Sequence, residues 1–164
     1  HKDIRVEMVR KVAEMVRDAG ISGTYHFMGG FPTETREEFI ETCRLIDHLR
    51  ELGDNVVVRE MSIFAPYPGV SLVKECEKLG YHEPKTLEEW IDMDWANPSR
   101  PWLSDEQSRL ISDAQFLIAR LGHPNAIMRA WVNLRWKQLL NSKKSFGLFE
   151  RPLIDFLKSR LLSM

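Results

Sequence analysis

Two turns rich in glycine and proline hold the residues whose types and spacing best suit ligand binding. The first spans residues 27–35, with the sequence FMGGFPTET. Its glycines, Gly29 and Gly30, allow the backbone to approach a ligand closely because no Cβ intervenes. A helix starting at Thr35 would add free N–H groups, which favour anions. The same residues also suit a tight structural turn, and spacing alone leaves both interpretations open.

The second turn spans residues 64–69, with the sequence FAPYPG. Its two prolines fix φ, and Gly69 permits a sharp reversal of the chain. Backbone carbonyl and N–H groups therefore point in fixed directions, which suits recognition of a flat polar ring edge such as that of adenine. A turn that simply ends a strand has the same composition, so this alternative also stays open.

The two cysteines, Cys43 and Cys76, lie 33 positions apart and belong to no CxxC or CxxxCxxC cluster. The chain therefore shows no metal site of its own. Both cysteines lie on apolar stripes, which predicts buried thiols in a reducing cytoplasm.

The elements around these turns alternate along the chain. Apolar spacing and turn residues predict helices over 3–18, 35–52 and 72–79, and strands over 24–28 and 55–64. Thr35 and Glu38 form a T-x-x-E capping box, which marks the start of the second helix. This alternation is typical of βαβ units with parallel strands. Two strands are too few for an independent sheet, which predicts a slice of a larger α/β fold.

The apolar face expected on the first helix consists of residues spaced by three and four: Ile4, Met8, Val12, Met15, Val16 and Ala19. Beyond residue 81, the stretch 82–103 is rich in Pro and Trp and is predicted to be a linker. Residues 104–164 are predicted to form an α-helical extension, with helices over 104–121, 125–141 and 152–162. An S-x-x-Q capping box at Ser104 opens the first of them.

The 164-residue chain has a net charge of −1, but residues 126–164 carry eight Lys and Arg against two acidic residues. Such a basic tail suits peripheral membrane contact, although a solvated helical surface has the same pattern. No apolar run approaches the ~20 residues that a membrane span needs. We therefore expect a cytoplasmic protein, with no nucleic acid as a partner.

The two turns, roughly 35 residues apart, resemble the GFPGET and F-x-PYPGT motifs of radical S-adenosylmethionine (SAM) enzymes. The chain is most similar to the cobalamin (B12)-binding type, which includes anaerobic magnesium-protoporphyrin IX monomethyl ester cyclase-like proteins. Residues 86–90, 94–95 and 101–102 resemble a segment after the barrel in that group, and 146–150 resemble its tail. The resemblance covers nearly the whole chain, and the two turns in this order are its most specific part.

The resemblance implies the C-terminal portion of a partial (β/α) TIM-like barrel, here residues 1–81, followed by the α-helical extension. In the full-length enzyme, SAM and a [4Fe–4S] iron–sulfur cluster would generate a 5′-deoxyadenosyl radical. Cobalamin would support methyl transfer or rearrangement. The family's CxxxCxxC loop is absent from this sequence. We therefore expect no catalytic residue, no bound cofactor and no activity in this chain alone.

The expected partners are the N-terminal half-barrel and cobalamin domain of the same polypeptide, together with a small-molecule substrate. This expectation treats the chain as part of a longer protein, because His1 runs directly into a helix. By the resemblance, the first turn would line the SAM pocket through Gly29, Gly30 and Phe31, with Glu34 orienting it. The alternative for Glu34 is a solvated carboxylate in the first turn of a helix.

The second turn would meet the adenine through Phe64, Ala65 and Pro66 by backbone contact and packing. His26 and Tyr67 are the candidate substrate contacts, although a hydrogen-bonded core histidine would also explain His26. The tryptophans at 90, 95 and 102 could cover the barrel mouth or simply pack.

The sequence departs from the family pattern at Thr33, where the family has Gly, and at Val70, where it has Thr. A Cβ at Thr33 restricts the first turn. Two other functions fit the residues. One is a non-catalytic adaptor built from a half-barrel and a helical tail, whose strand edges favour association. The other is a phosphate- or nucleotide-binding module, which the lack of Lys or Arg at 33–35 weakens.

Overall fold

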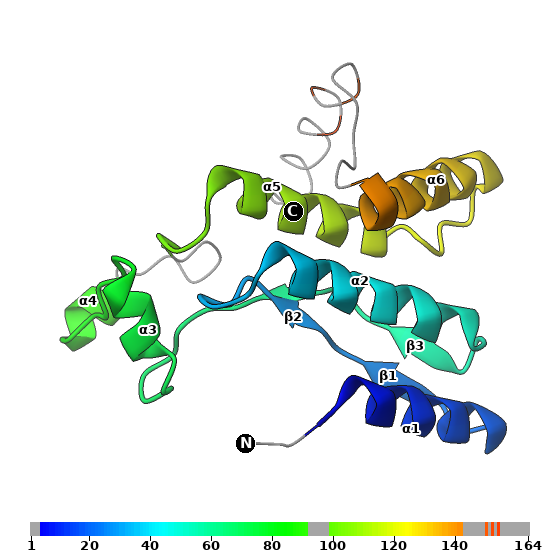
Figure 1. The fold of residues 1–164 in the computed structure, drawn as a ribbon, viewed down its shortest axis with the longest axis horizontal. Coiled ribbons are helices and arrows are strands. Elements are labelled where there is room, and N and C mark those ends of the chain that lie inside the picture. The colour runs from blue at the N-terminus through cyan, green and yellow to red at the C-terminus, as the bar shows by residue number, and fades with distance from the viewer. Residues whose placement is uncertain (1–3, 92–98, 143–149, 151, 153, 155–164) are drawn as a thin grey trace.

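The computed structural model describes residues 4–91, 99–142, 150, 152 and 154, and its elements alternate as in an α/β fold (Figure 1). In chain order they are α1 (Val6–Asp18), β1 (Gly23–Tyr25), β2 (Met28–Gly29), α2 (Arg36–Glu51), β3 (Val56–Val58), β4 (Ser62–Ile63), α3 (Val73–Lys78), α4 (Leu87–Ile91), α5 (Asp105–Ile118) and α6 (Ala126–Ser142). The expected order of helices and strands up to residue 79 is confirmed.

The strands pair in parallel, β1 with β3 and β2 with β4, which makes two short two-stranded sheets. Backbone hydrogen bonds bridge the gap between them, from Arg59 N–H to the Tyr25 carbonyl at 3.0 Å and from Ser62 N–H to the Phe27 carbonyl at 2.9 Å. The parallel α/β arrangement predicted from the sequence is therefore confirmed.

The register changes by one residue between the two sheets. Tyr25 pairs with Val58, whereas Met28 pairs with Ser62, so three steps on the first strand face four on the second. An extra residue on one strand of a pair is a β-bulge, which is rare in parallel pairs. Because side chains alternate along a strand, the extra residue places Met61 and Ile63 on the same face as Val58.

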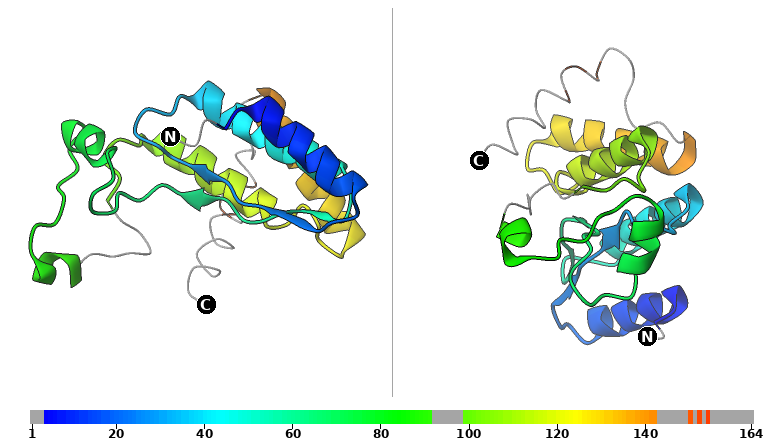
Figure 2. Two further views of the ribbon diagram at one scale, coloured as in Figure 1. Left: turned by 90° about the horizontal axis from the view of Figure 1, so that it is seen from below. Right: turned by 90° about the vertical axis from the view of Figure 1, so that its left-hand side faces the viewer.

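One face of the strand pair is covered by helices, and the opposite face is not. Tyr25, Phe27 and Val58 pack against the core that α1 and α2 form, and the left view of Figure 2 shows both helices on the same side of the strands. Thr24 and His26 alternate with these residues and are exposed. The described residues therefore leave the second face of the strands open.

Most of the predicted apolar face of α1 does not pack, although Val16 of that face is half-buried beside Gly23. Ala13 is fully buried and Val9 packs beside it, whereas Met8 is 52% exposed and Met15 is 60% exposed. The helix has two neighbouring apolar stripes, and the sequence pattern favoured the stronger one. Contact with α2 and the strands selects the weaker stripe, which consists of smaller, β-branched and Ala side chains that allow close approach.

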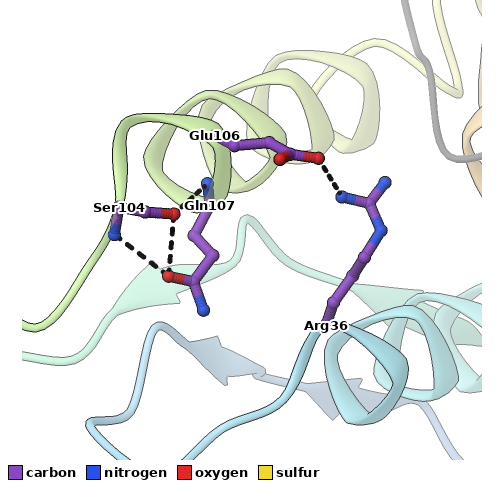
Figure 3. Close-up of polar contacts among 4 residues, drawn as sticks. All are labelled: Arg36, Ser104, Glu106 and Gln107. Atoms are coloured by element: carbon purple, nitrogen blue, oxygen red, sulfur yellow. Dashed lines mark hydrogen bonds and ion pairs between the residues drawn. The ribbon is translucent and has the colours of Figure 1, made fainter.

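Both strong capping boxes are present. At α2, Glu38 N–H donates to Thr35 Oγ1 at 3.2 Å, and Thr35 N–H donates to Glu38 Oε2 at 2.8 Å. At α5, Gln107 N–H donates to Ser104 Oγ at 3.2 Å (Figure 3). An ion pair joins the two helix starts, from Arg36 Nη1 to Glu106 Oε1 at 2.8 Å.

The helices α5 and α6 share the main core with α2. Figure 1 shows α5 and α6 as a layer on α2, and the cluster includes Ile46 of α2, Leu117 of α5 and Trp136 of α6. The Trp136 indole N–H also donates to Asp47 Oδ1 at 2.7 Å. The expected helical extension and the strand-containing part are thus in direct contact.

Several expectations fall outside the described residues: Trp95, the tail-like segment 146–149, the basic residues Lys143, Lys144, Arg151, Lys158 and Arg160, and most of the helix expected over 152–162. Within the described part of the chain, no helix has the length and apolarity needed to cross a membrane.

Candidate functional site

The first turn is shaped by contacts within the chain. A Cβ on Gly29 would lie 2.9 Å from the Phe39 ring, and a Cβ on Gly30 would lie 3.0 Å from Ile63. Gly30 also has a φ of 79°, in the left-handed region that favours glycine. Both glycines are buried. Close packing against the core therefore explains them without a ligand.

Glu34 folds back onto this turn. Its Oε2 accepts a hydrogen bond from the Gly30 N–H at 2.6 Å, and its own N–H donates to the Phe31 carbonyl at 3.1 Å. Burial raises the pKa of the Glu34 carboxyl above its usual value, and the backbone hydrogen bonds from Gly30 and Phe31 oppose part of that rise. Glu34 is thus half-buried and bonded to the backbone of its own turn, so it is not a fully solvated carboxylate.

The second turn divides into buried and exposed residues. Phe64 is 6% exposed, and Pro66 is fully buried. Ala65 is half-buried, whereas Tyr67 is 56% exposed at the rim. Of the four site residues predicted here, Tyr67 has the most surface available to another molecule.

The two turns meet at the same end of the parallel strands. Phe64 N–H donates to the Gly29 carbonyl at 2.8 Å, and the rings of Phe31 and Phe64 have centroids 5.0 Å apart. The structure therefore brings Gly29, Gly30, Phe31, Glu34 and Phe64 together. Ligands of parallel α/β folds bind at this end of the strands.

Residues 99–103 cover this end of the strands. Of these residues, the sequence analysis suggested such a position only for Trp102. Arg100 Nε donates to the Phe64 carbonyl at 3.1 Å, and the Trp102 indole N–H donates to the Gly30 carbonyl at 2.9 Å. Trp102 also stands edge-on to Tyr81, with ring centroids 6.0 Å apart. The only local signal was the density of Trp and Pro in this segment.

A groove of about 780 Å³ opens beside the first turn, between the starts of α1 and α2. Phe31, Thr33 and Glu34 line it on the side of the turn. The helices contribute mostly charged residues, namely Glu37, Glu38, Glu41, Arg44 and Arg10, with Thr42, Leu45 and Val6. With four carboxylates and two guanidinium groups, the groove favours a ligand that carries positive charge.

His26 lies on the open face of the strands and immediately precedes the first turn. It follows β1 and is exposed. The interpretation as a hydrogen-bonded core histidine is therefore wrong. Side chains alternate along the strand, so His26 points away from α1 and α2 while Tyr25 and Phe27 point toward them. An exposed position on this face is the one that a substrate contact would need.

The two thiols are structural. Cys43 and Cys76 are fully buried, as predicted. Burial raises the pKa of Cys43 to about 12, with a smaller contribution from the charge of Glu34. Within the described ranges, no group of His, Cys, Asp and Glu side chains could hold a metal ion.

Comparison with known proteins gives no relative: no family model, no curated protein and no solved structure matches this chain.

Proposed function

We propose that this chain is the C-terminal part of a radical SAM enzyme of the cobalamin-binding type. In this proposal its two strands and their turns help to bind SAM and the substrate, and the iron–sulfur cluster is held by another part of the enzyme. The chain alone is then inactive. The SAM-derived radical or a cobalamin-bound methyl group supplies the chemistry, and residues of this chain bind and orient the reactants.

The observation that carries the proposal is the meeting of the two motif-bearing turns at the carboxyl end of parallel strands. The hydrogen bond from Phe64 N–H to the Gly29 carbonyl joins the two turns where they leave the strands. Antiparallel strands, or turns at opposite ends, would have separated the two motifs and removed the basis for a shared ligand.

The groove gives independent support. SAM carries a sulfonium and an ammonium group, and both are positively charged. Glu34 and Phe31 line a groove rich in carboxylates beside the first turn. Carboxylates attract the charged groups, and the face of an aromatic ring attracts cations as well.

The open side of the strands supports a missing neighbour. Tyr25 and Phe27 direct their carbonyls toward the second strand, so Thr24, His26 and Met28 direct theirs toward the opposite edge. Among the described residues, that edge has no neighbouring strand. The exposed stripe of α1 with Met8 and Met15 is likewise uncovered. A preceding strand–helix unit of a barrel would cover both.

The test uses the complete polypeptide of the reading frame, reconstituted with iron and sulfide without oxygen. We expect a [4Fe–4S] cluster and cleavage of SAM to 5′-deoxyadenosine. Glu34→Gln should weaken SAM binding about tenfold, since one charge-assisted contact contributes on the order of 1.5 kcal/mol. Equilibrium dialysis with SAM measures this change.

The matched control is Glu77→Gln, which removes an exposed carboxylate of α3 outside the groove and should leave SAM binding unchanged. A fully cluster-loaded protein that forms no 5′-deoxyadenosine would contradict the proposal. So would a reading frame without a three-cysteine loop.

A second function is an adaptor that joins a separate chain. The internal pairing of the strand-end carbonyls favours it, because Arg100 and Trp102 occupy acceptors that a ligand would use. The adaptor predicts no SAM cleavage by the complete polypeptide, so the same measurement separates the two functions.

A further inference from the structure

Residues 99–103 run across the ends of both strands. Arg100 donates a hydrogen bond to the Phe64 carbonyl at 3.1 Å, and Trp102 donates one to the Gly30 carbonyl at 2.9 Å. These carbonyls belong to the two turns that follow β4 and β2. The segment therefore occupies the place from which a ligand would reach the strand ends.

Both contacts are of a kind that can open. Arg100 and Trp102 are half-buried, and the bonds that they form go to neutral carbonyls. Such a hydrogen bond shifts an equilibrium by a factor of roughly 2 to 10. Burial lowers the pKa of Arg100, and no described carboxylate pairs with it. Opening returns this guanidinium to water, which offsets part of the lost contact.

Ring contacts also hold Trp102 against the strand ends. Trp102 lies 6.1 Å from Phe64 and 6.0 Å from Tyr81, measured between ring centroids. The phenol oxygen of Tyr81 is buried and has no hydrogen-bond partner among the residues that the structure describes. An unsatisfied buried hydroxyl disfavours the closed state, because opening would let water reach it.

We propose that residues 99–103 form a latch that closes the strand-end site and must release before a ligand enters. In the open state, a donor group of the ligand takes the Gly30 carbonyl in place of the Trp102 indole N–H. The identity of the ligand as SAM rests on the proposed function, whereas the opening of the latch does not.

Hydrogen exchange on the complete polypeptide tests the opening without a ligand. Trp102→Phe keeps the ring and removes the N–H donor. The amides of Gly30, Phe64 and Leu103 should exchange about fivefold faster in this variant, at an unchanged rate for the α2 amides. If these three amides exchange in the wild type as slowly as the amides of the α2 core, the segment is a fixed part of the fold and the latch is refuted.

The matched control is Trp131→Phe, which removes another indole N–H donor, the one bonded to Glu150 Oε1 at 3.1 Å. It should leave the three strand-end amides unchanged. Equal acceleration in both variants would mean general loosening of the protein, which also overturns the latch.

Binding of SAM and of adenosine separates a latch from a brace. A closed latch reduces the apparent affinity by the fraction of open molecules, so Trp102→Phe should bind SAM up to about fivefold more tightly. Unchanged or weaker binding would mean that Trp102 supports the site, which contradicts the latch. If neither protein binds SAM, the proposed function fails, and the exchange rates still decide the latch.

Discussion

Single residues show where local sequence is a good guide and where it is not. The contact of Glu34 with its own turn could be predicted, because Glu34 and Gly30 are four positions apart and lie in one motif. The reason for Gly29 could not. Its constraint comes from the ring of Phe39, which α2 brings over the strand, and such a contact has no local pattern.

The pKa values of Glu34 and Glu38 shift in opposite directions. Burial raises that of Glu34 above 4.5, and hydrogen bonds from Thr35 lower that of Glu38 below 4.5. A raised folded pKa means stability that is complete below pH 4.5 and declines as pH rises through the folded value. The contribution of Glu38 behaves oppositely and is lost as pH falls below 4.5.

We therefore expect Glu34→Gln to gain stability relative to the wild type as pH rises from about 4 into the window above the ordinary carboxyl pKa. Urea unfolding at several pH values measures the difference in the free energy of unfolding. Glu38→Gln serves as the comparison: relative to the wild type it should lose stability as pH rises through the range below 4.5, where the wild type regains the contribution of the Glu38 carboxylate. A Glu34→Gln difference independent of pH would show that the Glu34 carboxyl is not perturbed.

Elements were predictable where their signals lie within a few residues. The boxes at Thr35 and Ser104 marked the starts of α2 and α5 because each signal spans one turn. The packing face of α1 was not predictable from its own sequence. Its two apolar stripes compete, and the choice between them is made by α2 and the strands.

Ser104→Ala should lower the free energy of unfolding by about 1 kcal/mol, because it leaves an N–H of the first turn of α5 without its acceptor. Removing the neighbouring ion pair by Glu106→Ala should cost less than about 0.5 kcal/mol, since the Glu106 side chain is 82% exposed. Urea unfolding of both variants checks the order. A larger loss for Glu106→Ala would assign the stability to the ion pair.

At the scale of the whole molecule, the composition of the chain suggested three segments, but the packing unites two of them. Leu117 of α5 and Trp136 of α6 are buried in one cluster with Ile46 of α2. The Pro- and Trp-rich composition of 82–103 indicated a linker. Its described end instead lies on the strand ends, because Trp102 finds partners in Phe64 and Tyr81 that are distant in sequence.

This shared core predicts a single unfolding transition. Leu117→Ala should destabilise the chain by about 2–5 kcal/mol through the cavity that it leaves. Native-state hydrogen exchange should show the amides of β1 and β3 losing as much protection as those of α5. Leu134→Ala, at a side chain 54% exposed on α6, is the control and should change little. Unaltered strand protection in Leu117→Ala would mean independent domains.

The one-residue shift between the strand pairs has a consequence for the second turn. If the same residues paired in a regular register without the bulge, Glu60 and Ser62 would share a face with Val58 and point into the helices. Met61 and Ile63 would then point to the opposite side. The direction of the backbone at Phe64 is thus decided several residues upstream. Deletion of one residue between Val58 and Met61 would therefore remove the bulge and still keep Met61 and Ile63 on the side of the helices.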